Sequence, residues 1–237
     1  MLLLEIKKNQ PAGIAYAITS MLEVEYGFQY KKKIKLSPTY LYCKSNNKDK
    51  QIYRDIMFIY VNGFPLEKCY PSDQIKSCCQ NEQCPSECKI EIDFPERVPS
   101  NPDEYKKKLL DMKNIIYHFD VFVAGLPVFK NWADDLSQEV IPEPTNEDLA
   151  IGPVGGHAVC FIGYRNKEGW EEGGYFMFKN SWGSKWGDEG YGKVSYNYMN
   201  KYAREIVFIY NYGGITNKVN PENCNYPPTP VGDINND

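Results

Sequence analysis

The hydrophobic pattern changes its period about halfway along the chain. Residues 15–26, 49–61 and 101–112 carry apolar side chains at helical spacing, and Gly27 and Asn62-Gly63 mark the ends of the first two runs. Ser37-Pro38 predicts the start of a further short helix, with the serine as N-cap and the proline in the first turn. Apolar and polar positions then alternate over short runs, which predicts strands at 117–125, 157–164, 175–180, 190–196 and 205–212. Helices first and strands second predict an α+β fold.

The composition changes again near the C-terminal end of the chain. From about Gly213 the chain becomes rich in asparagine and proline, most clearly over 220–230. Such segments are typical of linkers. The pattern therefore predicts one folded domain over 1–212 and a linker over 213–237.

Composition and charge exclude two classes of function. Of the 237 residues 42% are hydrophobic and 24% are charged, which suits a large folded domain. The net charge is −4, so the chain has no basic surplus with which to bind a nucleic acid. The longest apolar runs, such as 206–210, are too short for a helix that crosses a bilayer. We therefore expect neither a nucleic-acid partner nor a membrane partner.

The chain has eight cysteines, and five of them lie between residues 69 and 88. An even number with local clustering favours disulfides in a secreted protein. Free thiols or a zinc knuckle over 78–88 are the alternatives, but no histidine lies near that stretch and its spacings are not paired CxxC units. Residues 1–8 do not resemble a signal peptide, so we expect a secreted chain whose leader has been removed.

The chain has two histidines. His118 stands in the apolar run 115–123, where we expect a packed or edge histidine of a strand. His157 follows Gly155-Gly156, where the backbone leaves room for a close approach, and it opens a predicted strand. His157 is therefore the candidate for chemistry, although a structural role at the mouth of a strand remains open.

A motif after the predicted strand 175–180 connects this histidine to a known family. The run Lys179-Asn-Ser-Trp-Gly183, followed by Trp-Gly and Gly-Tyr pairs up to Gly192, resembles the papain-like cysteine peptidases. Residues 155–164 resemble the histidine strand of that family, and residues 8–20 resemble its nucleophile helix. Two more helix landmarks of the family are similar to residues 36–41 and 62–71.

The resemblance implies a fold, a substrate class and partners. It implies a papain-like fold with a helical N-terminal lobe over about 8–112, an antiparallel, β-barrel-like lobe over about 113–212 and a cleft between them. A peptide or protein substrate would lie in that cleft. A propeptide or a proteinaceous inhibitor would be further partners, and the domain would need no cofactor and no metal.

The resemblance also assigns roles to individual residues. His157 would be the general base, Asn180 would orient its ring, Gln10 would contribute to the oxyanion hole and Trp182 would cover the His157–Asn180 contact. Chemistry supports this set, because a thiolate nucleophile needs an adjacent base and the base needs a third group that fixes its ring. The spacing from position 15 to His157 lies inside the ~130–150 residues typical of the family.

The sequence departs from the family at the nucleophile. That residue should directly precede Tyr16-Ala17, but the position holds Ala15, and no cysteine precedes Cys43. A methyl group cannot attack a carbonyl, so we expect no peptide cleavage by this route. A deliberate Cys-to-Ala replacement and a natural pseudopeptidase that binds peptide or protein are both open. An acyl transferase or peptide ligase on the same fold is a third possibility. The retained Gln10, His157 and Asn180 favour the replacement.

The C-terminal tail carries a second, shorter resemblance. Residues 231–237 are similar to the start of a dockerin module, in which Asp233, Asn235 and Asp237 would alternate as calcium ligands. The resemblance implies a clostridial protein of the cellulosome type. Calcium and a cohesin partner would then belong to a dockerin module that is missing from this chain. A disordered polar tail is the alternative.

Overall fold

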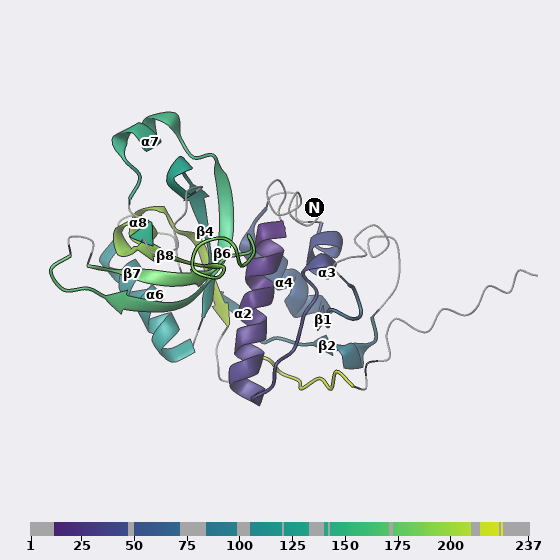
Figure 1. The fold of residues 1–237 in the computed structure, drawn as a ribbon. Coiled ribbons are helices and arrows are strands. Elements are labelled where there is room, and N and C mark those ends of the chain that lie inside the picture. Colours follow the sequence, from purple (N-terminus) through teal and green to yellow (C-terminus); the bar gives the residue numbers. More distant parts are fainter. Residues whose placement is uncertain are drawn as a thin grey trace, which may run out of the picture.

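The computed structural model places two groups of elements on either side of one long helix, α2 (Ala12–Tyr30) (Figure 1). Smaller helices lie on one side of α2, and a large sheet lies on the other side. No helix in the part of the chain that the structure describes is long and apolar enough to cross a membrane. The described residues are 12–46, 50–71, 84–98, 105–119, 121–132, 140–141, 143–170, 173–209, 214–222 and 224.

Helix α2 continues past Gly27, where the sequence pattern predicted its end. A glycine inside a helix costs only about 1 kcal/mol, and tertiary contacts can outweigh that cost. Here the rings of Tyr26 and Tyr30 pack 4.7 Å apart across the last turn. The Tyr30 hydroxyl also donates a hydrogen bond to the carbonyl of Ile215 (2.9 Å). The helix ends where Lys31 adopts a left-handed φ of 53°.

The other helices on this side of the molecule confirm two capping predictions. Helix α3 (Pro38–Lys44) begins with Ser37 as its N-cap, and the Ser37 hydroxyl accepts a hydrogen bond from the Tyr40 amide (3.1 Å). Helix α4 (Ile52–Asn62) ends at Gly63, which adopts a φ of 69°. A two-stranded sheet of β1 (Phe64–Pro65) and β2 (Lys89–Ile90) completes this lobe, with the one-turn helix η2 (Ser86–Cys88) before β2.

The second lobe is built on a seven-stranded sheet with the order β3-β9-β4-β6-β7-β8-β5. All neighbours are antiparallel except β5 and β8, which are parallel. In the described residues the edge strands β3 and β5 do not pair with each other, so the sheet of the expected barrel-like lobe does not form a closed barrel. The strands are β3 (Pro95–Arg97), β4 (Phe122–Val128), β5 (Val140–Ile141), β6 (Gly155–Asn166), β7 (Gly174–Lys179), β8 (Tyr191–Ser195) and β9 (Arg204–Ile209).

Strand β6 joins the two cores of the molecule because its side chains alternate between the faces of the sheet. Ala158 and Cys160 pack into the first core, which contains the buried face of α2. Val159 and Phe161 pack into the second core, on the other face of the sheet. The predicted strand 157–164 is thus confirmed, and His157 stands near its start, where both lobes come together.

Helix α6 (Tyr105–Phe119) corrects two predictions. It extends through residues 117–119, which the pattern assigned to a strand, so His118 lies exposed on a helix and β4 begins only at Phe122. The reason is the helical spacing of Met112 and Ile115, which are both buried in the second core. Because α6 packs against the sheet, Met112 belongs to the second lobe. Contrary to our expectation, the helical lobe therefore does not extend to residue 112.

Three further short helices were not predicted: η4 (Lys130–Trp132), α7 (Asn146–Ile151) and α8 (Tyr196–Tyr202). The start signals of α7 and α8 are present in the sequence. Thr145 and Asp148 form a capping box at α7. Ser195 caps α8 by accepting a hydrogen bond from the amide of Tyr198 (3.2 Å). Each helix is only one or two turns long, which is too short for an apolar period to appear in the pattern.

The linker prediction is wrong for the part of the tail that the structure describes, residues 214–222 and 224. Ile215 and Val219 are buried in the first core, and Ile215 forms a bridge with Ile92. The Tyr26 hydroxyl donates a hydrogen bond to the carbonyl of Val219 (3.0 Å). Asparagine and proline here belong to an extended segment packed on the helical lobe. The dockerin-like residues 231–237 lie outside the described residues.

Two disulfides connect the described cysteines, Cys69–Cys84 and Cys88–Cys224. Cys43 is also disulfide-bonded. Cys160 is the free cysteine of the described part, and it is buried. The expectation of disulfides is therefore supported, and Cys78 and Cys79 of the predicted cluster lie outside the described residues.

We expect protein made in an oxidising compartment to contain both bridges. Peptide mapping without reduction should find the Cys69 peptide linked to Cys84 and the Cys88 peptide linked to Cys224. A Cys160→Ser control should leave both linked peptides unchanged, because Cys160 forms no bridge. Free thiols at all four positions in such protein would contradict the pairing.

Candidate active site

His157 stands near the start of β6, in a stretch that pairs with β4 but not with β7. It pairs with Leu126 of β4 at the start of β6, and the two preceding residues, Gly155 and Gly156, are exposed. A Cβ atom added to either glycine would meet no atom within 4 Å. The backbone that leads to His157 therefore leaves open surface beside the ring, through which a ligand could reach it.

Asn180 holds the imidazole ring of His157. It directly follows β7, and its backbone amide donates a hydrogen bond to the Gly190 carbonyl (2.9 Å), which fixes its position. Its Oδ1 lies 2.8 Å from Nε2 of His157 and also accepts a hydrogen bond from the Ser181 amide (2.7 Å). Because Oδ1 can only accept, Nε2 of His157 must donate.

This contact sets the tautomer of the neutral ring. With the proton on Nε2, Nδ1 carries the free lone pair and can take up a proton. Burial lowers the pKa of His157 below its usual value, and the hydrogen bond to Asn180 acts in the opposite direction. The ring is therefore neutral at neutral pH, which is the form that a general base requires.

Aromatic side chains cover the His157–Asn180 pair. The ring of Trp182 stacks on His157 with a centroid distance of 4.9 Å and an interplanar angle of 25°. Trp186 and Trp132 meet Trp182 edge-on at 5.3 and 6.4 Å. Trp132 is fully buried, so it supports Trp182 from below. Sequence reasoning missed Trp132, because the short helix η4 that carries it has no recognisable motif.

The first turn of α2 lies against the Nδ1 edge of His157. A Cβ atom added to Gly13 would stand 3.0 Å from Nδ1 and 3.3 Å from Cε1 of that ring. Contacts this short require the ring to give by a few tenths of an ångström, so a side chain at position 13 would lie directly against Nδ1 of His157. Gly13 was not among the predicted site residues, and no motif in the sequence distinguished it.

The side chain of Ala15 does not lie beside His157, where the motif places the nucleophile. It is 2% exposed and belongs to the first core, and its carbonyl accepts a hydrogen bond from the Thr19 hydroxyl (2.7 Å). Two residues along an α-helix correspond to a rotation of about 200°, so Ala15 and Gly13 point to opposite sides of α2. The structure thus brings His157, Asn180 and Trp182 together and does not bring the side chain of Ala15 to them. Its assignment as the nucleophile position stays a prediction, and Gln10 lies outside the described residues.

No other described cysteine can serve His157 as a nucleophile. Cys160 is three residues further along β6, and its side chain enters the first core. It is fully buried, and burial raises its pKa to about 12, so it stays a thiol. The remaining cysteines of the described part are held in disulfides. As described, the site therefore has a base and an orienting residue but no thiolate.

A cavity of about 440 Å³ adjoins the His157–Asn180 pair. Tyr16, Ser20 and Glu23 of α2 form one wall, and residues 180–191 contribute to the opposite wall. Burial raises the pKa of Glu23 in this wall. The resemblance implied a cleft between the lobes but not the residues that line it, because its walls come from segments that are far apart along the chain.

The site shows no grouping of metal ligands within the described residues. The set there that could hold an ion consists of Cys69, Cys84 and Cys88, which belong to the helical lobe. The arrangement at His157, an imidazole ring that an amide orients on a two-lobed α+β scaffold, is suited to proton transfer. That combination defines the class of hydrolases that use a base to activate a nucleophile.

Comparisons with known proteins identify the family within that class. The sequence profile of the papain family cysteine proteases matches residues 2–212, and the chain belongs to this family. Its fold is papain-like: it is similar to the bromelain protease from Ananas comosus in complex with the E64 inhibitor, with a TM-score of 0.65 and 21% identity, over 86% of this chain and 91% of that one. Xylellain, a cysteine protease from Xylella fastidiosa, has a TM-score of 0.60 and 21% identity, over 84% and 79%.

Curated relatives are more similar in sequence but much longer. A probable cysteine protease of Arabidopsis thaliana is 31% identical over 140 residues, which are 58% of this chain and 34% of that protein. Cathepsin K of Gallus gallus is 28% identical over 195 residues, which are 78% of this chain and 53% of that protein. The chain therefore spans about a third to a half of the length of these relatives.

Proposed function

We propose that this chain is a papain-like endopeptidase module in which Ala15 replaces the nucleophilic cysteine, so that it binds peptide without cleaving it. The observation that carries the proposal is the 2.8 Å contact between Nε2 of His157 and Oδ1 of Asn180, which is intact although no described thiol can use it. The glycines before His157 leave open surface through which a peptide can approach the pair, and the tryptophans on the other side shield the pair from water.

In the active form of the module a cysteine at position 15 attacks the carbonyl carbon of the scissile peptide bond. Nδ1 of His157 takes up the thiol proton and returns it to the leaving amine. The side chain of Gln10 and the backbone amide of residue 15 stabilise the oxyanion. Water then hydrolyses the thioester, while Asn180 keeps the ring in the tautomer that exposes Nδ1.

The burial of Ala15 favours a second candidate, a natural pseudopeptidase. The methyl group of Ala15 packs in the first core, so it stabilises the fold in addition to replacing the nucleophile. In this case the cleft recognises a peptide or protein and holds it. An acyl transferase or ligase would share the thioester of the active form, and an added amine acceptor would distinguish it by the amide product.

We also propose secretion and a propeptide-type inhibitor as a partner of the module. The two bridges support secretion, because disulfides persist in oxidising compartments. A solved relative is a digestive procathepsin L of Tenebrio molitor, with a TM-score of 0.60 and 18% identity. A calcium-dependent cohesin partner would require a dockerin module beyond residue 237, so it is not a property of the folded domain.

The proposal predicts binding of peptide without turnover. Fluorescein-labelled casein peptides should raise the fluorescence polarisation when the chain is added, and mass spectrometry should find them intact afterwards. Gly156→Trp should weaken binding by about tenfold or more, because it adds a large side chain to the open surface directly before His157. Lys32→Trp, on an exposed residue beyond the end of α2, is the matched control and should bind normally. Peptide cleavage by the unaltered chain, or equal binding by both variants, would overturn the proposal.

A further inference from the structure

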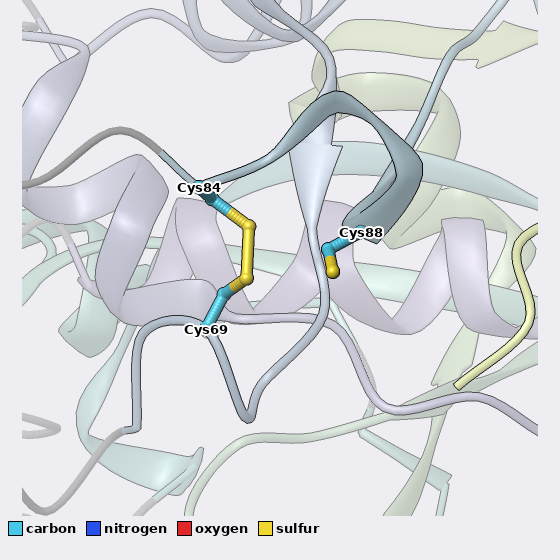
Figure 2. A group of neighbouring side chains, drawn as sticks. All are labelled: Cys69, Cys84 and Cys88. Carbon is cyan, nitrogen blue, oxygen red and sulfur yellow. A yellow bond between two sulfur atoms is a disulfide. The ribbon is translucent and has the colours of Figure 1, made fainter. Parts of the chain in front are cut away.

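Four cysteines gather in one buried place of the helical lobe, far along the chain from His157. The sulfur atoms of Cys69, Cys84 and Cys88 all lie within 4.8 Å of one another (Figure 2). Cys224 joins them through its bond to Cys88. All four residues are at most 4% exposed. We call these four residues the sulfur centre.

The backbone holds the sulfur centre together independently of its disulfides. Strands β1 and β2 pair through Phe64 with Ile90 and Pro65 with Lys89, which brings the segments that carry Cys69 and Cys88 side by side. The Leu66 amide donates a hydrogen bond to the carbonyl of Cys88 (2.9 Å). A second bond, from the Cys69 amide to the carbonyl of Leu66 (2.9 Å), closes the turn that carries Cys69.

The segment that carries Cys224 is also anchored by contacts of its own. The Thr216 amide donates to the carbonyl of Glu91 (2.9 Å), and Nδ2 of Asn217 donates to the carbonyl of Lys89 (2.9 Å). Val219 is buried in the first core. These contacts lie five to eight residues before Cys224, and the Lys68 ammonium donates a hydrogen bond to the carbonyl of Pro221, three residues before it. Together they keep this segment beside Cys88 when the disulfide is broken.

We propose that the sulfur centre has two forms: two disulfides when oxidised, and a four-thiolate site for a zinc-class divalent ion when reduced. Zinc prefers tetrahedral thiolate coordination with Zn–S bonds of about 2.3 Å, so its sulfur ligands are about 3.8 Å apart. The sulfur atoms of Cys69, Cys84 and Cys88 already satisfy the limit of 4.8 Å. Cys224 is bonded to Cys88, but its sulfur does not lie within that limit of all three atoms, so its side chain must rotate toward Cys69 and Cys84 when the four-thiolate site forms.

The conversion balances with a dithiol as reductant. Two dithiol molecules supply four electrons and four protons, which break both S–S bonds and give four cysteine thiols, while each dithiol becomes a cyclic disulfide. The metal ion then displaces the thiol protons as four Sγ–metal bonds form. The cysteine spacing left a zinc knuckle and disulfides as alternatives. On this inference a zinc site and disulfides are two states of one group of cysteines, which shares Cys84 and Cys88 with the stretch 78–88. This inference does not depend on peptide binding or cleavage.

Metal titration of the whole chain tests the inference. The chain is reduced with a dithiol without oxygen, the reductant is removed and Co²⁺ is added, followed by Zn²⁺. We expect one Co²⁺ per chain with the visible absorption of tetrahedral thiolate coordination, which Zn²⁺ then abolishes. Cys88→Ser and Cys84→Ser should each weaken Co²⁺ binding by about 100-fold or more, because each removes a ligand. Cys160→Ser is the matched control and should bind as the parent does.

Two results would overturn the inference. One is a reduced chain that keeps its native circular dichroism and binds neither ion. The other is Co²⁺ binding of equal strength in the reduced chain with and without 6 M urea (about the concentration at which small domains unfold), because such binding would not need the folded arrangement of the four thiols. A reduced chain that unfolds without metal and refolds when Zn²⁺ is added supports the inference, since the metal then supplies folding free energy.

Discussion

The Ala15→Cys variant should hydrolyse casein peptides, and an alkylating reagent should abolish this activity. The expected change is the largest of any single substitution in the chain, because covalent catalysis by enzymes exceeds the uncatalysed reaction by about 10⁶-fold or more. The motif assigns the reacting atom to position 15, and the proposed base, orienting amide and covering tryptophan are in place, so the expected activity requires the new thiol to reach Nδ1 of His157. The measurement is the rate of peptide cleavage with and without iodoacetamide, beside the unaltered chain.

Gly13→Cys is the control that tests the position of the nucleophile. The motif assigns the nucleophile to position 15, whereas an added Cβ at position 13 stands against Nδ1 of His157. If only Gly13→Cys is active, the chain is a peptidase scaffold in which the motif misplaces the nucleophile. If neither variant cleaves peptide although both stay folded, the proposed peptidase chemistry is wrong.

The same variants should change the pKa of His157. In the unaltered chain burial lowers this pKa. A thiolate beside Nδ1 would favour the charged ring, so the pKa of His157 should rise in the active variant and that of the new thiol should fall. The chain has two histidines, so NMR can follow both rings in one pH titration. A pKa of His157 that is unchanged in an active variant would contradict the ion pair.

The fold could be predicted from the sequence where an element has its own signals. Helix α3 begins at the expected Ser37-Pro38 cap, and strands β6 and β7 follow the alternating pattern. The failures have a common physical cause, which is tertiary contact. Tyr30 carries α2 past Gly27, burial of Ile115 continues α6 past Met112, and the packing of Ile215 turns an expected linker into part of the core.

The candidate site could be predicted in part for the same reason. His157 stands near the start of β6 and Asn180 directly follows β7. Because these neighbouring strands are antiparallel, the two residues lie at the same end of the sheet, within hydrogen-bonding distance. The contact of Gly13 with the ring depends on where α2 begins and how it rotates against the sheet. The sequence pattern specifies neither quantity. The two-form sulfur centre likewise depends on the β1–β2 pairing that brings Cys69 to Cys88.

His157→Ala in the Ala15→Cys background should reduce kcat by about 10³-fold or more, because it removes the base that takes up and returns the proton. Asn180→Ala should reduce kcat by only about 10–100-fold with little change in KM, since the ring keeps its chemistry but loses the bond that fixes its tautomer. Both side chains act after the substrate is bound, so both variants should leave KM nearly constant. They should differ in how far kcat falls.

Trp182→Ala completes this series, because Trp182 covers the His157–Asn180 contact and touches the ring at 4.9 Å. Without it, water can compete for the 2.8 Å hydrogen bond, and kcat should fall in the same direction as in Asn180→Ala. Steady-state kinetics of the three variants beside Ala15→Cys alone separate the roles. If Asn180→Ala raises KM and leaves kcat unchanged, Asn180 contacts the substrate rather than the base. In that case the hydrogen bond to His157 is a structural contact, and the orientation of the ring must come from its stacking on Trp182.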